Sequence, residues 1–426
     1  MAAAPLDRTV EAIWRMESAK VTARLARLVG DVGVAEDLAQ DTVVAALRRW
    51  PRSGVPDNPG AWLMATARYL AIDFLRRRDR LGEKYAALGP PPATIVDQVD
   101  AVLEEDLGDD LLGLVFMACH PVLSPEARVA LTLRLLGGLK TDEIARAYLV
   151  AEATVAQRIV RAKRTLAEAR VRFAVPDRAE RSARLGSVLE VVYLIFNEGY
   201  AATSGDDWMR VELCADAMRL GRVLAELVPD EPEVHGLVAL MELQASRVRA
   251  RTGPDGEPVL LLDQNRGLWD QVLIRRGLDA LDRAEALGGA LGPYALQAAI
   301  AACHARARTA EATEWDRIAA LYDALSQVAP SPVVEVNRAV ALSMAFGPEV
   351  GLALADELTA VPALADYHLL PGVRGDLLAK LGRHAEAQAE FLRAASLTRN
   401  ARERRVLLDR AAAEGDTGDP PPGVSI

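Results

Sequence analysis

Aromatic residues, cysteines and long hydrophobic runs are all scarce in this chain of 426 residues. Only 5% of the residues are aromatic, and the three cysteines, Cys119, Cys214 and Cys303, are widely separated and form no CxxC motif. This spacing excludes a disulfide framework and favours a reducing compartment, so we expect a cytoplasmic protein. No apolar run is long enough to span a bilayer and no signal peptide is visible, so we expect no membrane association.

Residue groups that hold metals or perform catalysis are also lacking. Cys119 and His120 are adjacent, but no further ligands follow at the spacing of a zinc site. The sequence contains neither a phosphate-binding loop nor a nucleophile elbow. We therefore expect no metal, no cofactor and no catalytic residue, and we predict that the protein is not an enzyme.

The abundant residues indicate helices. Hydrophobic residues make up 51% of the chain, alanine and leucine dominate, and few segments alternate with a period of two. The length indicates two or three domains. The sequence thus predicts an all-α protein with more than one packed helical domain.

Charge is distributed unevenly along the chain, whose formal net charge is −10. Residues 1–80 carry +3 and residues 120–175 carry +5, whereas residues 81–119 carry −7 and residues 176–426 carry −11. Two basic blocks therefore flank an acidic segment and precede a large acidic domain. This asymmetry indicates that the basic blocks contact nucleic acid and that the acidic domain does not.

The second basic block contains TDEIARAYLVAEATVAQRIVRAKRTL, residues 141–166, which predicts two short helices joined by a tight turn. Thr141 is the predicted N-cap of the first helix, and the second begins at about Ala153. The polar and basic outer face of the second helix contains Thr154, Gln157, Arg158, Arg161 and Lys163. This layout is typical of a DNA-reading helix-turn-helix, and an αα-hairpin with a solvated basic face is the alternative.

A supporting helix is predicted just upstream of this pair. SPEARVALTLRLLGG begins with Ser124 as the N-cap and a proline at the first helical position, and it ends in two glycines. Its apolar stripe provides a surface on which the helix pair can pack.

The first basic block predicts three helices. The second of them, residues 34–50, places Asp37, Gln40 and Asp41 within one turn on the same face. Residues 50–60, WPRSGVPDNPG, are rich in proline and glycine and are predicted to be non-helical. The third helix is capped by Asn58-Pro59 and ends in the basic cluster Arg76, Arg77, Arg78 and Arg80.

Residues 81–110 are predicted to be an acidic linker. GPPPAT opposes helix formation, and the charge run LEEDLGDD is expected to stay solvated. Residues 176–410 are predicted to be helical, and residues 411–426 are predicted to be a disordered tail.

Helix pairs recur in the last part of the chain. Gly347 and Gly382 are 35 residues apart, and LGRHAEAQAEFLRAA resembles the second half of a tetratricopeptide repeat, whose period is about 34 residues. An alanine-rich bundle without repeats is the alternative.

These motifs, taken in order, resemble the extracytoplasmic-function (ECF) sigma factors of bacterial RNA polymerase. AEDLAQDTVVAALRRW looks like the part of region 2 that binds the polymerase clamp, and NPGAWLMATARYLAIDFLRRR looks like the part that contacts the promoter −10 element. The segment from Leu123 to Leu166 looks like region 4, which reads the −35 element. The resemblance places region 2 in residues 1–80 and region 4 in residues 111–175. The remainder resembles the tetratricopeptide-type extension of one subgroup.

The resemblance implies specific contacts and partners. Core RNA polymerase is expected to bind Asp37, Gln40 and Asp41. The −10 element is expected to contact Trp50, Arg52, Asn58, Trp62, Arg68, Arg76 and Arg77, with a flipped base in the loop 50–60. For Trp62, packing in the core is the alternative. The −35 element is expected to contact Thr154, Gln157, Arg158, Arg161 and Lys163, with Gln157 and Arg158 reading bases. Ala156 stands where many family members have a basic residue.

Two other functions remain open. A helix-turn-helix regulator that binds an operator and signals through a repeat domain shares the second block, but it does not require the motifs of the first. An enzyme hosted by the acidic domain would draw on Glu198, Asp206, Glu233 and His235, although carboxylates at turns are usually solvated or capping. For a sigma factor, we expect the acidic extension to dock on the basic blocks and to control their activity.

Overall fold

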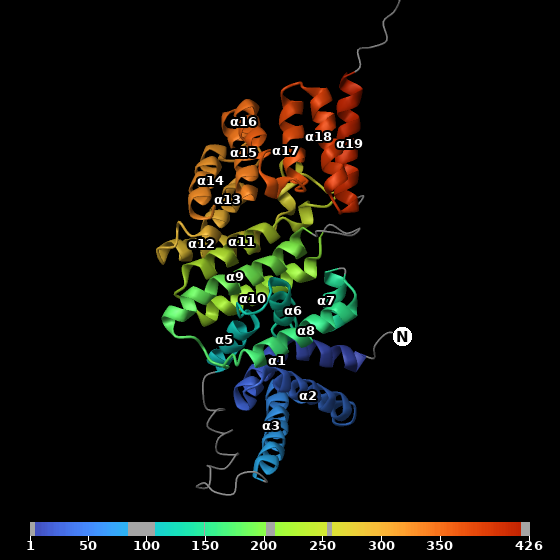
Figure 1. Ribbon diagram of the computed structural model, residues 1–426, viewed down its shortest axis with the longest axis vertical. Coiled ribbons are helices and arrows are strands. Elements are labelled where there is room, and N and C mark those ends of the chain that lie inside the picture. Colours follow the sequence, from blue (N-terminus) through green and yellow to red (C-terminus); the bar gives the residue numbers. More distant parts are fainter. Residues whose placement is uncertain (1–4, 84–106, 149, 202–208, 254–257, 419–426) are drawn as a thin grey trace, which may run out of the picture. The chain divides into compact units, whose positions relative to one another are not determined.

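The computed structural model describes residues 5–83, 107–148, 150–201, 209–253 and 258–418, and the regular elements of this part are helices (Figure 1). One isolated bridge joins Thr252 and Pro258. The chain divides into two compact units, unit 1 (residues 1–194) and unit 2 (residues 195–426), with the boundary inside helix α9 (Arg178–Tyr200). The prediction of an all-α protein is confirmed for the described residues.

Three long helices form the first block of unit 1, namely α1 (Pro5–Val29), α2 (Val32–Ser53) and α3 (Pro59–Glu83). Asp31 Oδ1 accepts the N–H groups of Gly33 and Val34 at 2.7 and 3.0 Å, so α2 begins directly after α1. Asn58 Oδ1 accepts the N–H of Ala61 at 3.0 Å and caps α3, as predicted. The shared core of the three helices includes Val21, Leu25, Leu38, Trp50 and Leu63.

The prediction that residues 50–60 are non-helical is wrong at their start, because α2 continues through Pro51 to Ser53. Trp50 is only 1% exposed, and its ring lies 5.4 Å from that of Trp62. This burial stabilises the last turn of α2 although proline lacks the N–H of a helical residue. Gly54, with φ of +78°, donates its N–H to the Trp50 carbonyl at 3.0 Å and ends the helix.

Four helices form the second block, namely α5 (Leu107–Ala118), α6 (Pro125–Leu135), α7 (Thr141–Ala147) and α8 (Glu152–Glu168). The start of α6 is confirmed, since Ser124 Oγ accepts the Ala127 N–H at 3.3 Å. Thr141 is not an N-cap. It is the first residue of α7, and the Glu143 carboxylate accepts the Lys140 N–H at 2.7 Å instead.

Part of the predicted solvated linker is a buried ion-pair site. Residues 107–110 belong to α5, and Asp110 is 0% exposed. Its carboxylate forms an ion pair with Arg24 at 3.0 Å and accepts a hydrogen bond from Arg27 at 3.2 Å, both on α1. Burial raises the pKa of Asp110, and the two guanidinium groups limit the rise. The prediction fails here because the compensating arginines lie more than 80 residues upstream. Residues 84–106 of the predicted linker lie outside the described residues.

The first part of α9 belongs to unit 1 and is held by the second block. Arg184 donates to the Phe116 carbonyl at 2.8 Å, and Ser187 Oγ donates to the Cys119 carbonyl at 2.8 Å. Arg128 forms an ion pair with Glu190 at 3.1 Å. Unit 1 therefore extends past the domain boundary predicted at residue 176.

Unit 2 contains α10 (Val211–Leu227), α11 (Pro232–Ala245) and α12 (Gln271–Ala286). The segment between α11 and α12, residues 246–270, is called the strap below. Its short 3-10 helices are η1 (Val248–Ala250), η2 (Leu261–Asp263) and η3 (Arg266–Leu268). α11 is almost entirely buried because it contacts α10, α12 and α13.

Two strap arginines cap helix ends in unit 2. Arg251 donates to the carbonyl of Tyr200, the last residue of α9. Arg266 donates to the carbonyls of His304 and Ala307, at 2.5 and 2.9 Å, where α13 ends. Helix C-termini carry unsatisfied carbonyls and a negative partial charge, so both arginines stabilise the ends that they contact.

The last part of unit 2 is an array of helices in which each helix contacts the next (Figure 1, orange to red). The array contains α13 (Pro293–Arg306), α14 (Trp315–Val328), α15 (Pro332–Phe346), α16 (Pro348–Leu358), η4 (Pro362–Leu364), α17 (Leu369–Lys380), α18 (His384–Leu397) and α19 (Ala401–Gly418). Close approach depends on small residues: Gly351 lies against Ser343, and Gly375 lies against the Phe391 ring. The predicted helix pairs are present, and their assignment as tetratricopeptide repeats stays a prediction.

The disordered tail predicted from residue 411 begins too early, because α19 continues to Gly418. Ala411 is buried, and its carbonyl accepts a hydrogen bond from Gln388 at 3.1 Å. Glu414 contacts His384 at 2.6 Å. These contacts with α18 stabilise the end of α19. Residues 419–426 lie outside the described residues.

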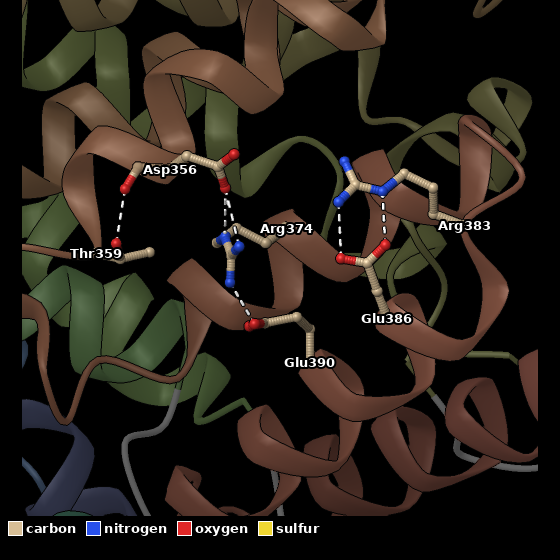
Figure 2. Close-up of polar contacts among 6 residues, drawn as sticks. All are labelled: Asp356, Thr359, Arg374, Arg383, Glu386 and Glu390. Carbon is tan, nitrogen blue, oxygen red and sulfur yellow. Dashed lines mark hydrogen bonds and ion pairs between the residues drawn. The ribbon is translucent and has the colours of Figure 1, made fainter.

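An arginine joins three helices of the array (Figure 2). Arg374 of α17 donates to Asp356 of α16 at 2.9 Å and also forms an ion pair with Glu390 of α18. A second arginine in the same view, Arg383, forms a two-pronged pair with Glu386 at 2.7 Å, three residues away and in solvent. The first arrangement connects separate helices, whereas the second is local.

We expect Arg374→Ala to destabilise unit 2 by about 1–3 kcal/mol, because Glu390 would lose its partner while remaining largely buried. Arg383→Ala is the matched control and should change stability little, since exposed local pairs contribute little. Denaturant midpoints of both variants check this. Equal midpoints for the two variants would contradict the proposed role of Arg374 in joining the three helices.

Candidate nucleic-acid interface

Helix α8 presents a polar and basic face to solvent. Val155, Ile159, Ala162 and Leu166 are buried against the rest of the second block. Of the predicted DNA contacts, Gln157 and Arg161 are exposed, and Thr154 and Arg158 are half-buried. The order of α7, a short turn and α8 agrees with the predicted helix-turn-helix.

Two residues of this face were missed by reasoning from the sequence. Val160 is 64% exposed, and Arg164 is exposed and paired with Glu168 at 2.7 Å. Together with Gln157 and Arg161 they follow a spacing of three, four and seven residues, which places all four on one stripe. The helical spacing was the available signal, but an exposed valine carries no charge to draw attention.

Lys163, predicted to contact DNA, is turned away from this stripe. Its ammonium group forms an ion pair with Glu36 of α2. Glu36 is 6% exposed and also accepts a hydrogen bond from Arg134 of α6 at 2.5 Å. Burial opposes ionisation of Glu36, but Lys163 and Arg134 outweigh it and lower the pKa of the carboxyl. In this arrangement Lys163 holds the two blocks of unit 1 together.

Two further charge contacts join the blocks. Arg15 of α1 pairs with Glu143 of α7 at 2.6 Å, and Asp110 of α5 receives the α1 arginines described above. The three contacts span α1, α2 and four helices of the second block. Unit 1 is therefore one body in which both blocks are packed together.

The acidic face of α2 is largely accessible. Asp37 and Asp41 are exposed, as predicted for a polymerase contact, and Gln40 is half-buried. Gln40 lines a cavity of about 580 Å³ between α1, α2 and the end of α6. Val44 and Leu47, exposed apolar residues of α2, line it as well. The predicted acidic face thus adjoins this cavity, which is lined partly by apolar side chains.

Among the residues predicted to contact the −10 element, Trp50 is wrongly assigned. Its ring is enclosed in the core and packs edge-on against Trp62, so it has no face available for a base. Trp62 is half-buried, which leaves packing as its main contact. Arg52 and Asn58 are exposed. Asn58 and the start of α3 line an open cavity of about 450 Å³ together with Met16 and Met64.

Helix α3 bears exposed basic and aromatic side chains. Arg76 and Arg77 are exposed, and Arg77 pairs with Asp73 at 2.5 Å. Arg68 is half-buried. Tyr69, which was not predicted, is 70% exposed beside it. Exposed tyrosine on an arginine-bearing helix is a combination that suits unpaired nucleic acid, since bases stack on aromatic rings.

The residues that an enzyme would use have structural roles. Glu198 is paired with Arg210, and Glu233 accepts the N–H of Tyr294 at 2.8 Å and caps α13. His235 contacts the Pro229 carbonyl at 2.8 Å. Asp206 lies outside the described residues. Within the described ranges, no cluster of three or more His, Cys, Asp or Glu residues has a geometry suited to a metal ion.

A helix able to cross a membrane is also not found in the part of the chain that the structure describes. The candidate functional surfaces of unit 1 are the accessible polar and basic surfaces of α3 and α8 and the acidic face of α2.

Comparisons with family models agree with this division. Residues 13–81 match the model described as Sigma-70 region 2, and residues 114–166 match Sigma-70, region 4. Residues 184–285 match a family of unknown function, DUF6596. The first two matches cover the two blocks of unit 1.

Several known proteins are similar to the chain. An uncharacterized protein of Rhizobium meliloti is 43% identical over 401 residues, which cover 92% of this chain and 93% of that protein. The ECF RNA polymerase sigma factor SigL of Mycobacterium tuberculosis is 31% identical over 169 residues, which cover 39% of this chain and 90% of SigL. The probable ECF sigma factor SigI of the same species is 31% identical over 172 residues, 39% of this chain and 57% of SigI. With both sigma-70 regions matched in order and most of SigL covered, the chain belongs to the ECF RNA polymerase sigma factors.

Proposed function

We propose that the protein binds core RNA polymerase, recognises the −35 and −10 elements of its promoters and initiates transcription from them. The observation that carries this proposal is the stripe on α8, where Gln157, Val160, Arg161 and Arg164 face solvent on the second helix of a helix-turn-helix. A basic and polar recognition helix is suited to the major groove. We further propose that it acts in the cytoplasm and without a cofactor.

At the −35 element, Arg161 and Thr154 contact phosphates, and Gln157 and Arg158 contact base edges. Glutamine suits adenine and arginine suits guanine, because each makes two hydrogen bonds with the groove edge of that base. Val160 supports a contact with a thymine methyl group, the apolar feature of the major groove.

At the −10 element, the exposed loop after α2 and the exposed face of α3 contact the separated strand. Arg52, Asn58, Arg76 and Arg77 are accessible for this role, and Tyr69 replaces Trp50 as the stacking residue. The cavity beside Asn58 is the place where an unpaired base is accommodated.

Unit 2 is proposed to control the sigma regions. Its residues, 195–426, carry a net charge of −11, opposite in sign to the blocks 1–80 and 120–175. Electrostatic attraction therefore favours docking of the extension on these blocks.

Core binding is expected to depend on the acidic face of α2. Replacing Asp37 and Asp41 by lysine should weaken core binding, because both side chains are exposed and their charges complement basic groups of a partner. Interferometry with purified core enzyme measures the change. The fold should persist, since neither residue is buried. An unchanged affinity would exclude this face as the polymerase contact.

Base readout is expected to distinguish Arg158 from Arg161. Arg158→Ala should weaken cognate promoters by about 1–3 kcal/mol and relax specificity at one position of the −35 element. Arg161→Ala should weaken all promoters alike and lower the salt dependence of binding. Competition binding with single-base promoter variants separates these results. A uniform loss with Arg158→Ala would assign that residue to the phosphate backbone.

One experiment tests the proposed function as a whole. Run-off transcription with core enzyme, the full-length protein and genomic fragments should yield discrete transcripts. An operator-binding regulator would bind DNA without retaining core polymerase in a pull-down and would give no transcript.

A further inference from the structure

Unit 2 is strongly acidic, but its arginines are concentrated in two short segments. The strap residues Arg247, Arg249 and Arg251 have no carboxylate between them, and residues 393–410 contain six arginines and two carboxylates. Elsewhere in residues 176–426 there are 17 basic and 35 acidic residues, a net charge of −18. Nine arginines of this acidic domain are thus concentrated in two short segments.

The two segments lie close together, and their nine arginines are called the arginine patch below. Glu403, in the first turn of α19, is close enough to Arg251 for their charges to interact. Burial opposes ionisation of Glu403, but hydrogen bonds from His368 and Thr398 and the charges of His368 and Arg251 outweigh it and lower the pKa. Figure 1 likewise shows the connection between α18 and α19 at the end of the array near the strap.

Some of these arginines have structural roles. Arg251 caps α9, and Arg404 donates to the carbonyls of Ala395 and Thr398 at 3.1 and 2.5 Å, which caps α18. Arg410 pairs with Asp376. Helix capping thus explains the positions of Arg251 and Arg404, and the ion pair with Asp376 explains that of Arg410.

Three exposed arginines of the patch carry unneutralised charge. Arg249, Arg393 and Arg399 are exposed, and none of their guanidinium groups has a carboxylate or hydrogen-bond partner among the residues that the structure describes. The half-buried Arg247 is flanked by the rings of Tyr200 and Trp269, with ring centroids at 5.9 and 5.8 Å. Burial is the main cause that lowers the pKa of His304 to about 4, and the nearby charges of Arg247 and Arg266 act in the same direction.

We propose that the arginine patch binds the phosphate backbone of double-stranded DNA, so that the extension of this sigma factor makes its own contact with promoter DNA. Guanidinium groups pair with phosphates without regard to sequence, so the contact adds affinity and no base preference. The strong negative charge of the rest of unit 2 repels DNA and restricts its approach to this surface. The proposal departs from the expectation that the acidic domain does not contact nucleic acid, because it assigns DNA binding to the arginine patch of that domain.

The DNA contact rests on the proposed function only for the identity of the DNA as a promoter. Two measurements distinguish failure of the DNA contact from failure of the proposed function. The first uses the full-length chain alone with a duplex that contains no promoter. The second uses the complex with core polymerase and a promoter fragment. Binding to both duplexes is measured by fluorescence anisotropy between 50 and 200 mM salt.

The test variant is Arg393→Glu/Arg399→Glu. It should bind both duplexes about tenfold more weakly at 0.1 M salt, and its salt slope should fall by about two, since each phosphate contact contributes about 0.9. The control is Arg275→Glu/Arg317→Glu, which has the same charge change at two exposed arginines of α12 and α14. It should bind DNA like the wild type. Arg393→Lys/Arg399→Lys should also retain binding, because lysine pairs with phosphate as a point charge.

Three results would overturn the proposal. Equal losses in the test and control variants would indicate a general charge effect. Unchanged binding in the test variant would exclude the patch. Weaker core binding with normal affinity of the assembled complex for DNA would assign the patch to an acidic protein surface. Failure of the wild type to recruit core polymerase would refute the proposed function but leave the measurement with the promoter-free duplex valid.

Discussion

Replacing Glu36 by glutamine is expected to destabilise unit 1 by about 3–5 kcal/mol, the usual effect of breaking a buried ion pair from one side. Glu36 is almost fully buried and neutralises both Arg134 and Lys163. A glutamine of similar shape keeps the packing but leaves two cations facing each other without an anion. The loss should therefore be electrostatic and not steric.

Thermal and denaturant unfolding of the full-length chain at neutral pH measure this change. The control is Asp37→Asn at the next position of α2, where the same loss of charge occurs in solvent and should have little effect. Because the folded-state pKa of Glu36 is lowered, its contribution is present above the unfolded pKa and is lost as pH falls through the folded pKa. The difference between wild type and variant should accordingly shrink in acid. Equal stability of both variants at pH 7 would show that the contact is not stabilising.

The same contact bears on promoter binding. The positions in their names place the −35 and −10 elements about 25 base pairs apart, which at 3.4 Å per base pair is about 85 Å. Glu36 and Lys163 hold the two predicted DNA-reading blocks in direct contact. We expect this contact to open when the protein reads both elements, because it holds the two blocks against each other. Glu36→Gln should therefore leave promoter binding by the polymerase complex intact or strengthen it.

Several helix starts could be predicted because their determinants are local. Ser124-Pro125 and Asn58-Pro59 each start a helix at the expected residue, since capping depends only on the few residues around the cap. The buried positions of α8 also follow the predicted spacing, with Val155 and Ile159 inside.

Most of the wrong predictions involve partners that are distant in the sequence. Asp110 looked solvated because its arginines are on α1, and Lys163 looked available because Glu36 is on α2. Trp50 looked like part of an exposed loop because Pro51 follows it, yet the core formed with Trp62 overrides the local preference. Charge and propensity are local signals, whereas burial is decided by tertiary packing.

The exposure of two residues within predicted helices, Val160 and Tyr69, was also not predicted from the sequence. Val160 and Tyr69 are large, apolar or aromatic residues, and such residues are usually buried. Their exposure became evident only when the opposite faces of α8 and α3 were seen to carry the packing. Both residues consequently enter the proposed interface from the structure.

Removal of unit 2 needs a cut that spares unit 1. Residues 176–194 belong to unit 1, where Arg184 and Ser187 contact the carbonyls of Phe116 and Cys119. A chain that ends at residue 175 would leave those contacts unmade. The better comparison is between the full-length protein and a chain that ends at Leu194.

We expect the chain that ends at Leu194 to fold but to be markedly less active in transcription than the full-length protein. We expect the extension to contact its partners as one body, because its array helices depend on one another for burial and its charge is opposite to that of the sigma regions. Typical couplings of 1–3 kcal/mol correspond to a loss of roughly 5–150-fold. Removal of unit 2 takes away both the arginine patch and the surrounding acidic surface, which carries a net charge of −18 outside the nine arginines of the patch. We expect the loss of this repulsion to outweigh the loss of the patch, so the basic blocks should bind non-promoter DNA more readily.

Run-off transcription from one cognate promoter, with both chains at matched concentration, measures the loss, and a competition assay with non-promoter duplex measures the gain in stray binding. A helical circular dichroism spectrum and cooperative thermal unfolding of the short chain control for misfolding. Equal activity would show that the extension is dispensable for initiation. Higher activity of the short chain would show that the extension inhibits the sigma regions, because an acidic domain that docks on DNA-binding surfaces can block as well as orient them.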